Sequence, residues 1–335
     1  MLIHNLLSFA GKVLARNKLS ILIYHQVFAE KDAMRPSEPD LKMFTWQMQL
    51  INKYFTPLSI SDALKHLENN TLPANAICVT FDDGYVNNLE IVAPVLHQFN
   101  IPATVYIATG FSGGENMFND RVIDLVADKA LLTLSLGVIE EQPIELNNME
   151  QRIKAAHYVL AKIKYLPIEE RKKLIDALYQ ENNASESPSK MMSVEQLKQL
   201  HAAGIEIGAH TVEHPILTVL EPVQQKEQIA KSKETLELWL GEKITGFAYP
   251  NGKITVDYDL TTKDIVEKLG FDYAVSTNWG ITTNNSDKYS FIYKEYGDYG
   301  NDSAIKTLNE LGEQLTDELL MELPTDQFSR YNKQE

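Results

Sequence analysis

The chain has 335 residues, of which 44% are hydrophobic and 9% aromatic, a composition typical of a globular protein with a sizeable core. A formal net charge of −15 argues against nucleic acid as a partner, because such binding depends on neutralising phosphates. The single cysteine, Cys78, excludes an internal disulfide framework, and its place in an apolar run favours a buried, inert thiol.

The segment from Met1 to Ala15 carries leucines at helical spacing, with basic residues late in the segment. A signal peptide has its positive charge first, so the order here is the reverse. The sequence has no run of about 20 apolar residues, the length needed to span a membrane. We therefore predict a helix covering the bottom of the fold and a cytoplasmic protein. The alternative is weak contact of this helix with a membrane surface, which would place the protein at the inner face of the membrane.

Apolar, β-rich segments then alternate with helical patterns, which is typical of βα units around a parallel sheet. We predict strands at residues 20–24, 77–81, 103–108, 205–209, 244–249 and 273–276. We predict helices at residues 44–54, 61–67, 87–99 and 223–240 and a further helix that stops at Gly270. Ser61 is the predicted N-cap of the second helix.

The pattern changes between about residues 115 and 190, where helical periodicity dominates apart from a strand-like run at 132–136. We interpret this region as an insertion between strands of one domain that covers residues 1–335. The charged run 169–173 is interpreted as a solvated helical face. Residues 301–335 are predicted to form an acidic, helical tail.

Two adjacent carboxylates, Asp82 and Asp83, follow the apolar run that ends at Phe81. Side-chain alternation would point them in different directions at a strand end, where loops open into a cleft. Adjacent carboxylates repel, so a cation or a proton must compensate them. Taken alone, however, such a pair before a glycine is more often a solvated turn.

A second motif supplies imidazoles. His210 and His214 lie four residues apart, so they can share one face of a helical turn and bind one metal ion. A lone pair of this kind is more often exposed or caps a helix. One Asp and two His, however, give three protein ligands and an open position, as in a catalytic metal site. Among divalent transition metals, this donor set favours zinc.

The motifs Thr80-Phe81-Asp82-Asp83-Gly84 and His210-Thr211-Val212-Glu213-His214 resemble, in form and order, those of the polysaccharide deacetylases of carbohydrate esterase family four. Residues 21–25 and 247–252 resemble the first strand and the third motif of the exopolysaccharide-type branch of that family. Residues 99–107 resemble the strand that follows the first motif, and residues 197–208 resemble the helix and strand that lead into the second. The resemblance covers about residues 20–297. It implies an α/β fold, a distorted seven-stranded (β/α)-barrel with a helical insertion.

The resemblance also implies roles for individual residues. Asp82 would be the catalytic base, and Asp83, His210 and His214 would hold the metal. The turn at Tyr249, Pro250 and Asn251 would contact substrate, with the Asn251 backbone N–H donating to the oxyanion. Candidate pocket residues are Tyr85, Trp279 and Lys294; for Trp279 a core position is an equal alternative, and Lys294 stands where an arginine is expected.

The chain departs from the family pattern at two places. Ala248 stands where many members carry an arginine that orients the base, and no histidine follows His214 to serve as the general acid. His25, at the end of the first predicted strand, is the predicted substitute. The alternative for His25 is a core histidine bonded to backbone.

The resemblance implies a metal-dependent hydrolase that removes N-acetyl groups from the sugars of a polysaccharide, an oligosaccharide or a lipid-linked glycan. Two alternatives remain open. One is a metal-dependent amidase acting on a small non-sugar amide. The other is a catalytically silent carbohydrate-binding member of the fold. The sequence makes no prediction of oligomeric state.

Overall fold

The computed structural model describes residues 17–137, 139–140, 142–278, 281–283, 285–292 and 294–295. The predicted N-terminal helix, the predicted acidic tail and Trp279 lie outside these residues. Among the described helices, none combines the length and the apolar character needed to cross a bilayer.

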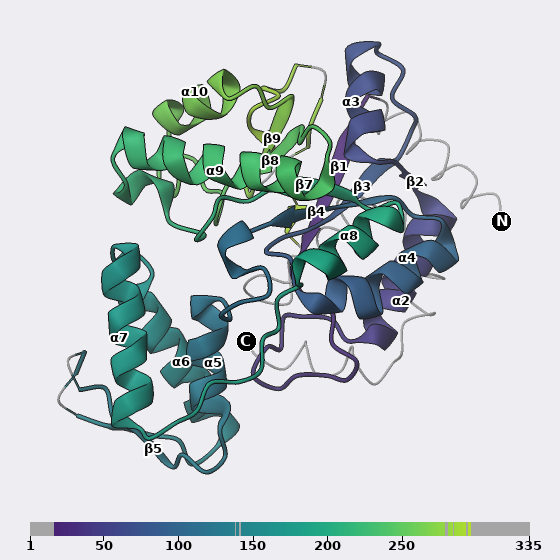
Figure 1. Cartoon of the computed structure of the whole chain (residues 1–335). Helices are drawn as coiled ribbons and strands as arrows, with labels where there is room; N and C mark the ends of the chain where they lie inside the picture. Colours follow the sequence, from purple (N-terminus) through teal and green to yellow (C-terminus); the bar gives the residue numbers. More distant parts are fainter. Residues whose placement is uncertain are drawn as a thin grey trace.

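A curled parallel sheet forms the centre of the molecule (Figure 1). Its strands pair in the order β10-β9-β8-β7-β4-β3-β1-β11, and β2 pairs with β3 outside this path. Their bounds are β1 (Leu19–Tyr24), β2 (Thr56–Pro57), β3 (Ala76–Phe81), β4 (Ala103–Ile107), β7 (Glu206–Ala209), β8 (Gly246–Ala248), β9 (Tyr273–Ser276), β10 (Phe291–Ile292) and β11 (Lys294–Glu295).

The segment that holds β10 and β11 joins the two ends of this sheet. β10 pairs with β9 and β11 pairs with β1, although the two strands follow each other directly in the chain. Counted as one interrupted strand, this segment is the seventh strand beside β1, β3, β4, β7, β8 and β9. The predicted distorted (β/α)-barrel is therefore confirmed.

Strands β1, β3 and β4 are buried along their whole length, because both faces of the sheet are covered. Alternate residues of β1 enter two different apolar clusters. Ile21 and Ile23 belong to the first cluster, and Leu22 belongs to the second. The first cluster fills the barrel, where Tyr106 Oη of β4 donates to Tyr273 Oη across the interior at 3.1 Å. The second cluster lies between the sheet and the helices that surround it.

Helices α9 (Pro222–Leu240) and α10 (Leu260–Lys268) lie on one side of the sheet, and α2 (Leu41–Tyr54), α4 (Ala93–Phe99) and α8 (Val194–Ala202) lie on another (Figure 1). Helix α3 (Ile60–Glu68) lies apart from both groups and packs its apolar residues against the first cluster. The predicted N-cap of α3, Ser61, is wrong: Ser59 Oγ accepts from Asp62 N at 3.0 Å, which starts the helix early enough to bury Ile60. The helix predicted at 87–99 begins with a π-helical turn, Asn88–Val92.

The predicted insertion is helical and forms a lobe between β4 and β7 (Figure 1). Its elements are α5 (Phe118–Ala127), β5 (Thr133–Leu134), β6 (Ile144–Glu145), α6 (Met149–Ile163) and α7 (Ile168–Glu181). The lobe has its own apolar cluster, to which Met34 of the β1–α2 loop also contributes. One part of its charged run is not solvated as predicted, because Arg171 is buried. The organisation as a single domain stays a prediction.

Candidate metal centre

The two motif segments meet at one rim of the barrel. Asp82 and Asp83 follow β3, and His210 follows β7, with only β4 between these strands in the sheet. Because parallel strands end at the same edge, the side chains converge there. Asp83 Oδ1 lies 3.6 Å from the Nε2 atoms of both His210 and His214, and Asp82 Oδ2 lies 3.7 Å from His210 Nε2.

Both carboxylates turn toward His210, so the prediction that they point in different directions is wrong. Asp83 has a φ of 75°, which interrupts the extended backbone and its alternation. Such left-handed backbone costs of order 1–3 kcal/mol in most residues but is tolerated best by Asp and Asn. Gly84 continues the turn at φ 91°, and a Cβ there would lie 2.9 Å from Ile107 Cδ1.

The predicted helical turn at His210 and His214 is also wrong. The segment is a loop, with Thr211 at φ 65° and His214 at φ 48°. Two backbone N–H groups of this loop donate to side chains and fix its conformation. Thr211 Oγ1, within the loop, accepts from His214 N at 3.1 Å, and Gln228 Oε1 of α9 accepts from Glu213 N at 3.0 Å. These bonds, rather than helical periodicity, bring both imidazoles to Asp83.

A backbone carbonyl fixes the His210 ring. Nδ1 of His210 lies 2.8 Å from the oxygen of Ala248, which can only accept, so Nδ1 carries the hydrogen. The lone pair of Nε2 therefore faces the carboxylates, which is the tautomer that a metal ligand requires. Ala248 thus acts through its main chain at the position where the family pattern places an arginine.

Burial sets the charge state of the three candidate ligands. Burial raises the pKa of Asp83 to about 8, helped by the nearby charge of Asp120. It lowers the pKa of His210 to about 3 and that of His214 well below its usual range. The imidazoles are therefore neutral at pH 7, and the carboxylate lacks a compensating cation.

These residues fit a divalent transition metal. Their ligand atoms lie within 4.8 Å of one another. The buried Oδ1 of Asp83 accepts no hydrogen bond from any described residue, and distances of 3.6 Å to two imidazole nitrogens are too long for such bonds. Two neutral imidazoles and one carboxylate around a common point are the donor set of a three-ligand metal site.

His25 follows β1 at the same rim and is half-buried. Its ring makes no hydrogen bond to a described residue, unlike the backbone-bonded core histidine considered as the alternative. The His25 charge contributes to the lowered pKa of both His210 and His214, which indicates proximity to them. Burial lowers the pKa of His25 itself to about 4, and the charge of Asp120 opposes this shift.

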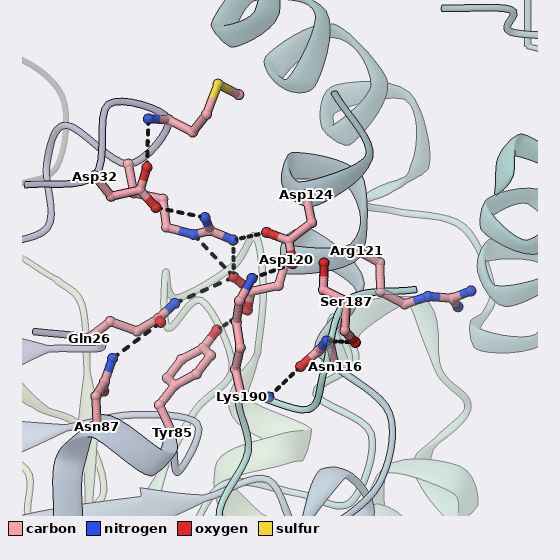
Figure 2. A network of polar contacts seen from close by, with 12 residues as sticks. Gln26, Asp32, Tyr85, Asn87, Asn116, Asp120, Arg121, Asp124, Ser187 and Lys190 are labelled. Atoms are coloured by element: carbon pink, nitrogen blue, oxygen red, sulfur yellow. Dashed lines mark hydrogen bonds and ion pairs between the residues drawn. The ribbon is translucent and has the colours of Figure 1, made fainter. Parts of the chain in front are cut away.

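Sequence reasoning missed Asp120, which lies at the centre of the polar network in Figure 2. This fully buried residue of α5 accepts from Tyr85 Oη at 2.7 Å and from Arg35 Nε at 3.1 Å and Nη2 at 2.5 Å. Tyr85, predicted as a pocket residue, is therefore buried under the first motif. No local pattern could have linked Asp120 to Arg35, 85 positions away.

The turn after β8 presents a backbone donor. Asn251 has a φ of 59°, and its N–H makes no hydrogen bond within the described part of the chain. Gly252 follows at φ 74°, where a Cβ would lie 2.7 Å from Thr277 N. Pro250 is buried, and Tyr249 is a core residue whose hydroxyl donates to Tyr289 O at 2.9 Å. Among the three predicted residues of this turn, the Asn251 N–H is therefore the group left to donate, and the contact of the turn with substrate stays a prediction.

The other two predicted pocket residues, Lys294 and Trp279, stay predictions. Lys294 lies in β11 opposite Leu22, and its side chain is outside the described part, as is all of Trp279.

Two curated proteins are similar to this chain. The putative polysaccharide deacetylase YxkH of Bacillus subtilis is 21% identical over 274 residues, covering 82% of this chain and 69% of the relative. Poly-beta-1,6-N-acetyl-D-glucosamine N-deacetylase of Staphylococcus aureus (strain N315) is 28% identical over 98 residues, which are 29% of this chain and 34% of that protein.

Solved structures share the fold. The deacetylase PplD of Streptococcus pyogenes, in complex with acetate, superposes with a TM-score of 0.58 at 20% identity, covering 88% of this chain and 98% of that one. IcaB from Ammonifex degensii gives a TM-score of 0.57 at 19% identity, covering 88% and 97%. Residues 69–274, more than half of the chain, match the sequence profile described as polysaccharide deacetylase, and this protein belongs to that family.

Proposed function

We propose that this protein removes N-acetyl groups from the sugars of a glycan by metal-dependent hydrolysis. Polysaccharide deacetylases are metal-dependent hydrolases that act on the carbon–nitrogen bonds of N-acetylated sugars. One observation carries the proposal for this chain: Asp83 Oδ1 lies 3.6 Å from Nε2 of both His210 and His214, with Asp82 Oδ2 3.7 Å from His210 Nε2. The donor set favours zinc.

Asp83, His210 and His214 would hold the metal. A divalent ion held by these residues would lower the pKa of a water molecule toward about 7 and would polarise the acetyl carbonyl. Asp82 would take the proton of the attacking water, since the other three side chains complete the ligand set. The Asn251 N–H would donate to the oxyanion, because it makes no other hydrogen bond to a described residue. His25 would protonate the leaving amine; because burial lowers its pKa to about 4, the ring would first have to take up a proton.

Acetate release from glycans and from small amides separates this proposal from its alternatives. Purified protein is stripped with a chelator and reloaded with zinc, cobalt or manganese, and acetate release is measured from N-acetylglucosamine oligomers and from small N-acetyl amides. We expect metal-dependent release from the oligomers. Faster turnover of the small amides would favour the amidase alternative, and no release from any substrate by a folded, metal-loaded protein would favour a silent carbohydrate-binding protein.

A further inference from the structure

Four arginines in the described part of the chain are buried, and three have acceptors that match their donors. Their partners are Asp32, Asp120 and Asp124 for Arg35; Asp176 and Glu186 for Arg121; and the carbonyls of Val126, Asp128 and Leu131 for Arg152.

Arg171 of α7 differs from these three. Arg171 is the most buried of the four arginines, at 4% exposure. Its one hydrogen bond to a described residue is nevertheless long, from Nη2 to Glu213 O at 3.4 Å. No carboxylate of the described residues lies within ion-pair distance. A guanidinium has five N–H donors, and its burial without a matching anion is costly.

The surroundings of Arg171 connect it to the metal centre. Its one acceptor, the backbone oxygen of Glu213, is next to His214 in the loop 210–214, called the ligand loop from here on. The Arg171 charge also contributes to the lowered pKa of His214. The guanidinium lies over the Phe118 ring, 4.0 Å from the centroid, which fixes its plane. The carboxylate of Glu213 is engaged elsewhere, since it accepts from Gln228 Nε2 at 2.7 Å. Burial lowers the pKa of Arg171 to about 10, so it stays charged at neutral pH.

We propose that Arg171 is an anion-binding residue of the deacetylation site, and that the accepted glycan carries an oxyanion, a carboxylate or a phosphate, close to the sugar that loses its acetyl group. The inference rests on the proposed function. A planar guanidinium held against a ring suits the two oxygens of such a group, and the charge of a metal at His214 would add to the attraction. In a chain with a net charge of −15, recognition of an anion requires a local cation of this kind.

A purely structural role predicts a different arrangement. Arg152, in the same lobe, ties its helix to a loop with two guanidinium nitrogens and three carbonyl oxygens at 2.6–2.9 Å. Arg171 has one such acceptor, at 3.4 Å, and therefore keeps donors for a ligand.

Calorimetric titration of the full chain, metal-free and zinc-loaded, tests the inference without turnover. The ligands are a disaccharide of N-acetylglucosamine and glucuronic acid, N-acetylglucosamine 1-phosphate, and neutral di-N-acetylchitobiose. We expect one of the acidic ligands to bind roughly 10- to 100-fold more tightly than the neutral one, the range of charge-assisted hydrogen bonds. The stronger acidic ligand identifies carboxylate or phosphate as the group recognised.

Variants locate the effect. Arg171→Met should remove the preference for the acidic ligand, and Arg171→Lys should keep only part of it, because lysine is a point charge. Lys172→Met is the matched control: it removes one positive charge from the next position of α7, where the exposed Lys172 pairs with Glu115, and should keep the preference.

The inference is overturned if the wild type binds neither acidic ligand, or binds acidic and neutral ligands equally. It is also overturned if Arg171→Met, shown to be folded by circular dichroism, keeps the preference. Should Arg171→Met not fold, Arg171→Lys and the wild-type comparison decide. Failure of acetate release from every glycan would defeat the proposed function while leaving these affinities to stand. Equal kcat/KM on acidic and neutral glycans would defeat this inference alone.

Discussion

Replacing Asp83 with Asn should stabilise the metal-free protein while removing its ability to be stabilised by metal. The carboxylate is 4% exposed, and burial raises its pKa from 3.8 to about 8. Between these two pH values the unfolded chain loses the Asp83 proton and the folded chain keeps it. The free energy of unfolding therefore falls as pH rises from about 4 to about 8, and this contribution is constant above that range.

The magnitude follows from the interval between 3.8 and 7. At about 1.36 kcal/mol per pH unit, Asp83 destabilises the metal-free fold by up to about 4 kcal/mol at pH 7. Asn is close to isosteric with Asp, does not titrate, and tolerates the φ of 75° at this position equally well. The two proteins should therefore have similar stability near pH 4 and diverge as pH rises.

The assay is urea unfolding followed by circular dichroism, in chelator, at pH values from 4 to 8, and then with zinc added. Metal should stabilise the wild type strongly and Asp83→Asn weakly, because one of three ligands is lost. Asp82→Asn is the matched control and should keep the metal-induced gain. Parallel pH profiles for metal-free wild type and Asp83→Asn, or a less stable Asp83→Asn at pH 7, would refute the reasoning.

Four further predictions concern the residues around this centre. Asp82→Asn should retain about one metal ion per chain by elemental analysis while acetate release falls by about 10²- to 10⁴-fold; near-normal turnover would mean that another group is the base. His25→Ala should lose far more activity on an N-acetyl amine than on an activated acetate ester, whose leaving group needs no proton, and equal losses would contradict its role as the acid. Asp120→Asn should lower the free energy of unfolding by about 3 kcal/mol in urea titration, since it leaves Arg35 with one partner fewer, and an unchanged value would mean that the network is not a stabilising one. Replacing residues 115–190 with a short linker should change relative kcat/KM among glycans at constant metal content; unaltered kinetics on every glycan would make the insertion structural only.

The parts of this protein that could be predicted from sequence are those encoded locally. β3 is buried on both faces, so it appears as a continuous apolar run, and the two carboxylates directly follow it. The strands that close the barrel could not be located from local patterns, because β10 and β11 are two residues long each and depend on pairing with strands far away in the chain. The periodicity of hydrophobic residues cannot reveal strands as short as these.

The composition of the candidate site was predictable, but its geometry was not. The left-handed backbone at Asp83, Thr211 and His214 reverses what alternation and helical spacing predict. Those conformations depend on tertiary contacts such as the bond that Gln228 accepts from the ligand loop. Arg171 was missed for a related reason: it stands in a run of charges that resembles a solvated face, and its burial comes with tertiary contacts to Phe118 and Glu213.

The insertion contacts each of the two metal-binding segments through a buried charge. Asp120 of α5 accepts from Tyr85, two residues after Asp83, and Arg171 of α7 donates to Glu213, one residue before His214. Deleting the whole lobe removes an anion and a cation together, so a change in substrate preference could not be assigned to either one. The point substitutions separate them: Asp120→Asn should lower stability with little effect on the choice between acidic and neutral glycans, and Arg171→Met should alter that choice without lowering stability. If both variants changed the two properties together, the lobe would act on the site as one rigid body rather than through two separate contacts.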